Sequence, residues 1–185
     1  VALISPAMRF FPLLLLPILL AQPSARAAAF EFKDGDRVVL LGGTLIEREQ
    51  KFGILETHLA LAVGTRKITV RNLGWSGDTV FGTARSYFGP PSEGIERLTK
   101  HLEMLQPTVL IASYGHDVAL DRELKIDDFI AGYETLLDLA RSKSPGLRII
   151  IVAPPPFENL GAPLPDMTAA NARLGQPEIR IGFIP

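Results

Sequence analysis

The chain has 185 residues, of which 47% are hydrophobic, with 19 basic and 20 acidic side chains. This composition fits one compact globular domain and excludes a largely disordered protein. A formal net charge of −1 gives no electrostatic reason to expect nucleic acid or an anionic membrane surface as a partner. Cysteine is absent, which excludes disulfides and thiolate catalysis, and His58, His101 and His116 lack zinc-ligand spacing. We therefore expect neither a metal nor a cofactor.

The N-terminal stretch differs from the rest of the chain. Arg9 precedes an apolar run from Phe10 to Leu20, and two overlapping A-x-A patterns lie between Ala25 and Ala29. This pattern predicts a secretory signal peptide over residues 1–29, with Met8 as a candidate start, and hence a periplasmic or secreted protein. The alternative is an uncleaved membrane anchor, which the short, proline-broken run disfavours. After cleavage we expect no membrane span, and a single domain over residues 30–185.

From residue 37 onward, short β-rich runs alternate with amphipathic stretches. In the stretches, apolar residues recur at steps of three and four, as in Phe52, Leu55, Leu59 and Ala62. This alternation predicts an α/β fold, a three-layer α/β/α sandwich around a mostly parallel sheet. The predicted strands cover residues 37–41, 67–74, 108–113 and 147–154, and the predicted helices cover residues 47–63, 93–105 and 126–142.

The C-terminal part begins with a proline-rich loop, Ala153 to Pro165. A short helix is expected over residues 166–174 with Asp166 as its N-cap. A strand of two or three alternations follows and the chain then stops. A domain of this kind ordinarily finishes with another complete helix, so we expect that the last helix is missing and that the domain is truncated at its C-terminus.

Three loops that follow predicted strands carry unusual residues: "GGTLIE" (42–47), "GWSGDTV" (74–80) and "YGHDVAL" (114–120). Ligands bind beyond the carboxyl ends of strands in an open parallel sheet. Glycine after a strand is common in ordinary turns, so each loop alone is a weak signal. Three such loops at one edge indicate a site. A nucleotide site is disfavoured, because "LLGGTLIE" has neither a P-loop lysine nor a G-x-G-x-x-G pattern.

Between Asp34 and Asn171 the chain resembles the SGNH, or GDSL-type, hydrolases, a family of esterases and acylhydrolases. It is most similar to a divergent, exported bacterial branch. Gly42–Leu45 stands where the family has G-D-S-L, and "NLGWSGDTV" matches its second block, with Gly77 at the oxyanion-hole glycine. Gly115–Val118 meets the third block, G-x-N-D, only loosely. The resemblance implies a flavodoxin-like sandwich, no required metal, and a small-molecule or glycan ester as substrate.

The resemblance also implies roles for single residues. The family's serine attacks an ester carbonyl after a histidine near the C-terminus removes its proton. The nucleophile's own N–H, the glycine N–H and the asparagine amide hold the oxyanion. In this sequence Thr44 would take the serine's position, Gly77 the glycine's and Asp117 the asparagine's.

This sequence departs from the family pattern three times. Thr44 adds a methyl group that restricts χ1 and crowds the path of attack. Asp117, when ionised, is only an acceptor and would repel an oxyanion, unless an apolar pocket kept it as a neutral acid. The D-x-x-H block is absent, since no histidine follows His116. Loss of the base histidine from a serine protease lowers kcat by about 10⁶-fold.

Several interpretations stay open. His116 is a candidate substitute base beside the Asp117 carboxylate, or else an ordinary loop residue. Asp78 either orients the site or, more often for this pattern, caps a helix, and Trp75 either lines the cleft or packs under the sheet. The leading hypothesis is an ester hydrolase whose base lies outside this chain. The alternative is a non-catalytic exported module that binds a glycan or cell-envelope ligand. The sequence predicts no oligomeric state.

Overall fold

A computed structural model of the protein describes residues 30–121 and 123–176. The chain divides into two compact units, Val1–Glu31 and Phe32–Pro185, and the fold below is that of the second. The predicted signal peptide and the strand expected near the C-terminus lie outside the described residues. The elements are β1 (Arg37–Gly42), α1 (Thr44–Phe52), α2 (Ile54–Val63), β2 (Thr69–Asn72), the short 3₁₀ helix η1 (Ala84–Ser86), α3 (Pro91–Leu105), β3 (Val109–Ser113), α4 (His116–Leu120), α5 (Ile126–Lys143), β4 (Arg148–Ile151) and α6 (Thr168–Leu174).

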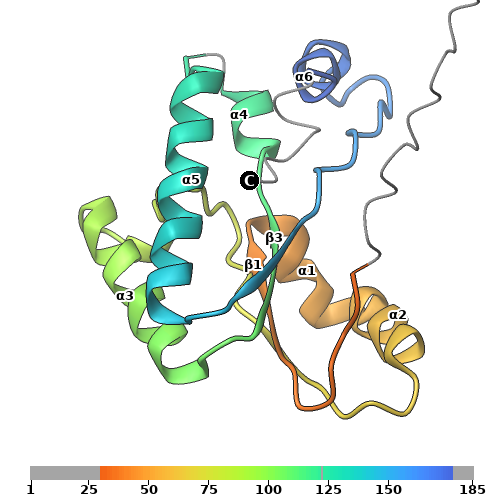
Figure 1. The fold of residues 1–185 in the computed structure, drawn as a ribbon. Helices are drawn as coiled ribbons and strands as arrows, with labels where there is room; N and C mark the ends of the chain where they lie inside the picture. The colour runs from red at the N-terminus through yellow and green to blue at the C-terminus, as the bar shows by residue number, and fades with distance from the viewer. Residues whose placement is uncertain (1–29, 122, 177–185) are drawn as a thin grey trace, which may run out of the picture. The chain divides into compact units, whose positions relative to one another are not determined.

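Four parallel strands form the sheet in the order β2-β1-β3-β4 (Figure 1). Val39 of β1 stands beside Arg71 of β2 on one side and beside Leu110 of β3 on the other. Helical connections join the strands, so all four strands end at the same edge of the sheet. The chain adds β2 on one side of β1 and then β3 on the other. The carboxyl ends of β1 and β3 therefore form the topological switch point, where α/β sheets bind ligands.

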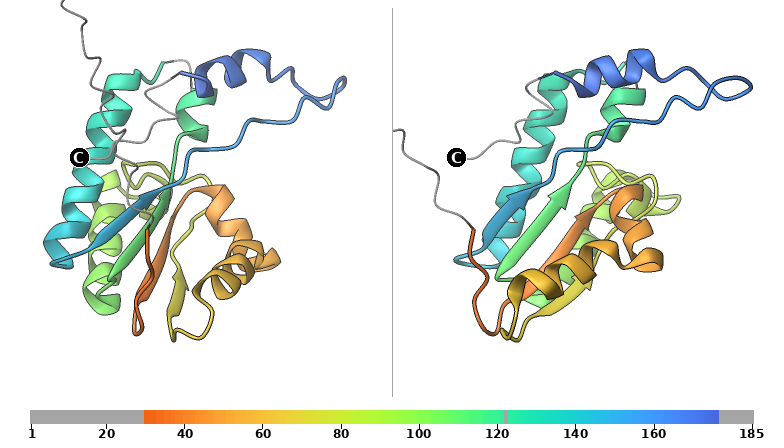
Figure 2. Two further views of the ribbon diagram at one scale, coloured as in Figure 1. Left: turned by 45° about the vertical axis from the view of Figure 1, so that its right-hand side comes forward. Right: turned by 90° about the vertical axis from the view of Figure 1, so that its right-hand side faces the viewer.

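Alternate side chains of β1 build two cores, one on each face of the sheet. Val39 and Leu41 belong to the core formed with α3, α4, α5 and α6. Val38 and Leu40 belong to the other core, with Ile46 of α1 and part of α2. Figure 2 shows the resulting layers, with α1 and α2 on one side of the sheet and α3 and α5 on the other. The predicted three-layer α/β/α sandwich is confirmed.

The single helix predicted over residues 47–63 is wrong, because the chain breaks there into α1 and α2. Gly53 adopts a left-handed conformation with φ of +63°, and its N–H donates to the Glu49 carbonyl at 2.7 Å. The Glu49 carboxylate accepts the N–H of Leu55 at 2.6 Å and so holds the start of α2. Phe52, assigned to the apolar face by its spacing, is 61% exposed. The left-handed residue Gly53 therefore ends α1, although the apolar residues keep helical spacing on both sides of it.

The helix predicted from Asp166 begins two residues later, at Thr168. The N-cap is Met167, so the prediction of Asp166 as the N-cap is wrong by one position. Asp166 still stabilises the start of the helix. Its carboxylate accepts the backbone N–H of Thr168 at 2.9 Å and the Thr168 hydroxyl at 2.6 Å. These hydrogen bonds lower the pKa of Asp166, so the carboxylate remains charged at the positive end of α6.

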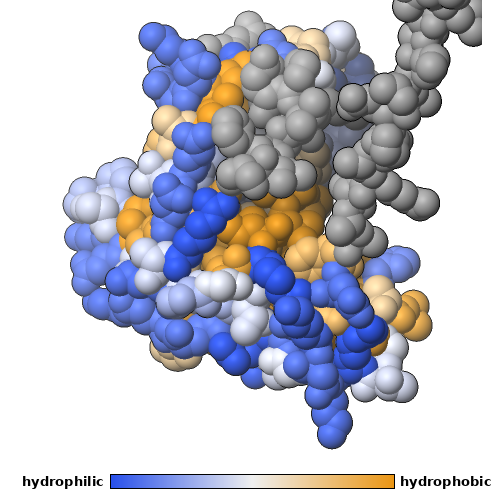
Figure 3. Space-filling view, in the orientation of Figure 1, coloured by the Kyte–Doolittle hydropathy of each residue, from blue (hydrophilic) through white to orange (hydrophobic). Residues whose placement is uncertain are grey.

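The strand β4 lies at the end of the described sheet and is half-buried along its whole length. Figure 3 shows apolar side chains gathered over this part of the molecule. Ile149 and Ile151 pack against the core that contains Val39 and Leu41, and Ile150 packs against the core that contains Val38 and Leu40. None of the helices in residues 30–121 and 123–176 is long and apolar enough to cross a membrane.

Candidate functional site

A pocket of about 160 Å³ opens at the switch point between β1 and β3. Its lining comes from the junction of β1 and α1, from the loop after β2, and from the segment that runs from the last residue of β3 through α4. The four residues with predicted roles, Thr44, Gly77, His116 and Asp117, all line the pocket. The lining is Gly43, Thr44, Leu45, Gly77, Asp78, Ser113, Tyr114, Gly115, His116, Asp117 and Leu120. The structure thus brings Thr44 and Asp117, which lie 73 positions apart in the sequence, to one pocket.

Thr44 is the first residue of α1, directly after the glycine pair that ends β1, and it is exposed. Its Oγ1 accepts the backbone N–H of Gly77 at 3.0 Å and lies 3.3 Å from the Ser76 hydroxyl. Gly77 has φ of +72°, a conformation that side-chain-bearing residues rarely adopt. This turn directs the Gly77 N–H at the Thr44 hydroxyl. Thr44 Oγ1 therefore lies at the N-terminus of α1 and accepts a hydrogen bond from the loop after β2.

The loop after β2 lies very close to α1. A Cβ atom added at Gly74 would lie 2.3 Å from the Glu47 backbone nitrogen and 2.5 Å from the Ile46 carbonyl carbon. The Asn72 side chain links the same segments, since its Nδ2 donates to the Ile46 carbonyl at 2.7 Å and its Oδ1 accepts the Gly74 N–H at 2.7 Å. These contacts fix the distance between Thr44 and the Gly77 loop.

The prediction that Asp78 caps a helix is wrong. No helix begins at Asp78, and the next element, η1, starts at Ala84. Asp78 is instead buried, and its Oδ2 accepts Nε of Arg85 at 2.6 Å and the Tyr114 hydroxyl at 3.1 Å. Burial raises the pKa of the Asp78 carboxyl, while the charge of Arg85 opposes the rise. The salt bridge between Asp78 and Arg85 is buried, and its aspartate lines the pocket. Sequence analysis did not predict this pair.

Asp117 is the second residue of α4, two positions after the N-cap Gly115. Its Oδ1 accepts the Gly115 N–H at 3.2 Å. Its Oδ2 is buried and has no hydrogen-bond partner within residues 30–121 and 123–176. Burial raises the pKa of the Asp117 carboxyl, against the opposing effect of nearby backbone N–H groups and of His116.

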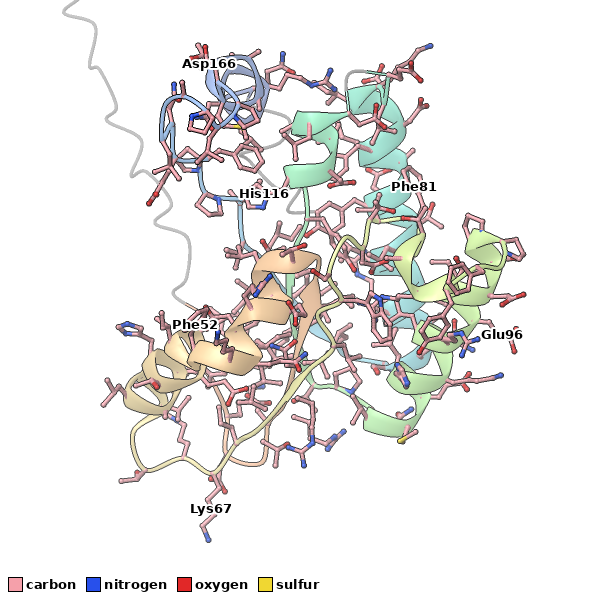
Figure 4. The ribbon with its side chains drawn as sticks, turned by 180° about the vertical axis from the view of Figure 1, so that it is seen from behind. Phe52, Lys67, Phe81, Glu96, His116 and Asp166 are labelled. Carbon is pink, nitrogen blue, oxygen red and sulfur yellow. The ribbon has the colours of Figure 1, made fainter. Side chains whose placement is uncertain are left out.

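His116 contacts the long loop that follows β4, as Figure 4 shows from behind. Its Nε2 lies 2.8 Å from the Pro155 carbonyl oxygen, and its ring packs against Phe157 at a centroid distance of 4.8 Å. A carbonyl only accepts, so Nε2 carries the hydrogen and Nδ1 is left as the basic nitrogen. Asp117, the expected partner, instead bonds the Gly115 N–H, so the backbone of Pro155 orients this ring.

Asn171 on α6 holds that loop in place. Its Oδ1 accepts the N–H of Phe157 at 2.8 Å and its Nδ2 donates to the Phe157 carbonyl at 2.9 Å. Sequence analysis assigned no role to Asn171, because nothing local marks a contact across 14 residues. Trp75 is half-buried and packs edge-on against Tyr87 at 5.5 Å, and it is not among the described residues that line the pocket.

The other two histidines are not among the described residues that line the pocket. His58 is exposed on α2, and His101 is half-buried on α3. Within the described part of the chain, no three histidine, aspartate or glutamate side chains are grouped so that they could hold a metal ion.

No protein-family model matches the sequence, and neither does any curated protein. Solved structures do match. A gut microbial diltiazem-metabolizing enzyme superposes on 79% of this chain with a TM-score of 0.55 at 19% identity. The lipase/acylhydrolase from Enterococcus faecalis superposes on 75% of it with a TM-score of 0.52 at 20% identity. This chain covers 33% of the first protein and 67% of the second. The likeness establishes the SGNH/GDSL-type hydrolase fold, which confirms the family resemblance at the level of fold.

Proposed function

We propose that this domain hydrolyses esters, with Thr44 as the nucleophile. One observation carries the proposal: the Gly77 N–H donates to the Thr44 hydroxyl at 3.0 Å inside a pocket at the switch point of the sheet. An N–H donor so close to a nucleophile's oxygen is also close to the oxygen of a carbonyl under attack. The fold shared with a lipase/acylhydrolase supports the same reaction class.

The reaction has two halves. Thr44 Oγ1 attacks the ester carbonyl carbon while its proton passes to a base, and the tetrahedral oxyanion is held by the N–H groups of Gly77 and Thr44. The intermediate collapses, and the alcohol leaves with the proton from the base. Water then attacks the acyl-threonine by the same route in reverse, which releases the carboxylic acid and restores the hydroxyl.

His116 is the base that we propose within the described chain. Its ring lines the pocket, and the Pro155 carbonyl holds Nε2–H at 2.8 Å, so Nδ1 is the nitrogen available to take a proton. The arrangement has the logic of a triad, in which a backbone carbonyl replaces the orienting carboxylate. A base supplied by chain beyond the described residues is the competing source.

The substrate and the location belong to the same proposal. A pocket of about 160 Å³ suits an acetyl or other short acyl group, including the acetyl esters of carbohydrates. The apolar run from Phe10 to Leu20 and the A-x-A patterns after it support export to the periplasm or the medium.

The test is hydrolysis of p-nitrophenyl acetate by the full chain and by Thr44→Ala and Thr44→Ser variants. We expect alanine to abolish turnover. We expect serine to raise the rate by about tenfold or more, because the methyl group that hinders attack is gone. Thr135→Ala, on the exposed surface of α5, is the matched control and should leave the rate unchanged. Equal rates for the wild type and Thr44→Ala would remove Thr44 as the nucleophile.

The second candidate function is binding without turnover, to a glycan or cell-envelope ligand. It is favoured by threonine at the serine position, aspartate at the asparagine position, and a His116 ring tied to the Pro155 carbonyl. Under this function neither the wild type nor the Thr44→Ala or Thr44→Ser variant hydrolyses p-nitrophenyl acetate. Calorimetric titration with an acetylated xylo-oligosaccharide should then give binding that a pocket variant such as Leu45→Trp removes.

A further inference from the structure

A second cavity lies beside the candidate pocket, between α4 and α6. Its volume is about 220 Å³, and the two helices contact each other at this end of the sheet, as Figure 2 shows. Leu120, the last residue of α4, lines both cavities. A ligand seated at Thr44 can therefore extend past Leu120 into the second cavity.

The second cavity is lined mainly by hydrocarbon. Six of its eight lining residues are apolar: Ala119, Leu120, Pro165, Met167, Ala169 and Ala170. The other two are charged, and each already has a partner in the protein. Asp166 accepts Nδ2 of Asn159 at 3.0 Å, and Nη2 of Arg173 donates to the Leu124 carbonyl at 2.8 Å. A sugar bound there would leave hydroxyl groups against apolar side chains, whereas an alkyl group would gain free energy by leaving water.

Leu120 is placed to contact a ligand and does not build the core. Its side chain is 54% exposed, and among the described residues it belongs to neither core. An apolar side chain at the junction of two cavities gains free energy when a hydrocarbon group covers it. The structure thus offers an apolar ligand one exposed leucine with a hydrocarbon-lined cavity beyond it.

The position of Leu120 on α4 indicates which part of an ester reaches it. His116 and Leu120 lie four residues apart on this helix, so they share one of its faces and are about 6 Å apart along its axis. Both line the pocket that contains Thr44. In the proposed reaction the His116 ring returns the proton to the departing alcohol, so the alcohol oxygen lies next to that ring. The carbon chain of the alcohol then continues along the same face, past Leu120, into the second cavity.

We propose that the second cavity binds the alcohol group of the ester and that this alcohol is a hydrocarbon, while the pocket at Thr44 holds the short acyl group. The inference rests on the proposed hydrolysis by Thr44 and names the alcohol side of its substrate. Leu120 contacts the alcohol where the two cavities meet. The substrate class is therefore short-acyl esters of apolar alcohols, in preference to those of sugars.

Two pairs of isomeric esters test the proposal: butyl acetate with ethyl butyrate, and hexyl acetate with ethyl hexanoate. Each pair has one composition, but the added methylene groups lie on the alcohol in one ester and on the acyl group in the other. From ethyl to butyl to hexyl acetate, kcat/KM should rise about threefold per methylene group, because each leaves water in the transition state. Titration of the released acid measures the rates. A rise confined to the acyl series would place the acyl chain in the second cavity and overturn the proposal.

Ala169→Trp and Ala172→Trp form a matched pair on the exposed surface of α6. Ala169 lines the second cavity, so tryptophan there should fill the cavity and remove the rise along the alcohol series. Ala172 is not among the described lining residues, and its variant should keep the rise. An unchanged rise in Ala169→Trp, or a larger loss with acetylated xylobiose than with hexyl acetate, overturns the proposal and leaves ester hydrolysis standing. No hydrolysis of any ester by the wild type overturns both.

A binding measurement does not depend on turnover. In saturation-transfer NMR of the full chain, 1-hexanol should receive signal from the wild type and from Ala172→Trp, and should lose it with Ala169→Trp. Hexanoate is the comparison, because its chain belongs to the acyl side and its signal should not respond to Ala169→Trp. Contact with 1-hexanol that survives in Ala169→Trp, or that is absent from the wild type, would rule out the second cavity as the alcohol site.

Discussion

Arg85 and Asp78 form a salt bridge of 2.6 Å in which both side chains are buried, with exposed fractions of 3% and 0%. The Arg85 guanidinium also donates to the carbonyl of Leu73, at the start of the same loop. The Tyr114 hydroxyl reaches the shared Asp78 oxygen from the end of β3. The pair therefore links the loop that contains Gly77 to the end of β3, and both Asp78 and Tyr114 line the pocket.

Removing the arginine alone should destabilise the protein strongly. Arg85→Met leaves the Asp78 charge buried without its partner, which costs about 3–5 kcal/mol in comparable pairs. The double variant Arg85→Met/Asp78→Asn removes the stranded charge and should recover part of that loss. Urea unfolding followed by circular dichroism measures both. Equal destabilisation of the single and double variants would contradict the pairing. Lys100→Met, which breaks an exposed pair with Glu96, should change stability little.

The acid stability of the protein should depend on Asp36, at the opposite end of the sheet. Burial raises the pKa of Asp36, but hydrogen bonds from Arg148, Lys33 and Thr108 outweigh that effect and lower it overall. The Thr108 hydroxyl donates at 2.7 Å and the Lys33 N–H at 2.6 Å. The ionised form is therefore favoured by folding. Its stabilisation is complete above the unfolded value of about 3.9 and disappears as the pH falls through the lower folded pKa.

The variant Asp36→Asn gives the measurement. Its free energy of unfolding should be lower than that of the wild type at pH 7, and the two should converge as the pH falls below about 3.9. Urea titrations at pH 7, 5 and 3 follow this convergence. A constant gap at every pH would mean that the charge of Asp36 is not what stabilises the fold.

The alternation of strands and helices was predictable because each apolar run is short and flanked by glycine, proline or polar residues. The stretch "TVLIAS" became β3, buried along its whole length from Val109 to Ser113. The position of the pocket followed as well, since parallel strands end at one edge and their loops meet there. The single helix predicted over residues 47–63 was wrong for a local reason. Gly53 interrupts an apolar periodicity that spans two separate helices.

The partners of the buried side chains were not predictable, because they depend on tertiary contacts. Asp after glycine fits a helix cap, yet Asp78 is paired with Arg85, seven residues away and buried. Nothing in "GTARSYFG" marks that arginine as a core residue. The orientation of His116 likewise depends on the Pro155 carbonyl, 39 residues later in the chain. Spacing identifies which residues reach the pocket, and packing decides what each one contacts there.

The loop after β4 should depend on Asn171 for its position. Asn171→Ala leaves the N–H and the carbonyl of half-buried Phe157 without their partners, at a cost of about 1–3 kcal/mol. Because Phe157 and Pro155 contact the His116 ring, the variant should also lower kcat on p-nitrophenyl acetate. Asn171→Asp keeps the acceptor for the Phe157 N–H and should lose less stability. A stable Asn171→Ala with full activity would show that the loop holds itself.

Close packing of α1 on the loop after β2 should make Gly74 intolerant of any side chain. In Gly74→Ala the new methyl group would overlap the rigid backbone of Ile46 and Glu47, at 2.5 and 2.3 Å, so α1 must move away. Overpacking of this kind costs about 1–3 kcal/mol. The shift also separates Thr44, at the start of α1, from the Gly77 N–H, so hydrolysis of p-nitrophenyl acetate should fall by more than the loss of folded protein explains.

The matched control for Gly74→Ala is Gly175→Ala, after α6. Gly175 has φ of −73°, which alanine adopts readily, and a methyl group there would lie 3.4 Å from the nearest backbone oxygens. Alanine also has fewer unfolded conformations than glycine, so this variant should be neutral or slightly more stable. Thermal unfolding and the assay are measured on both. If Gly74→Ala retained wild-type stability and rate, the contact between α1 and the Gly77 loop would not be what places the Thr44 hydroxyl against its N–H donor.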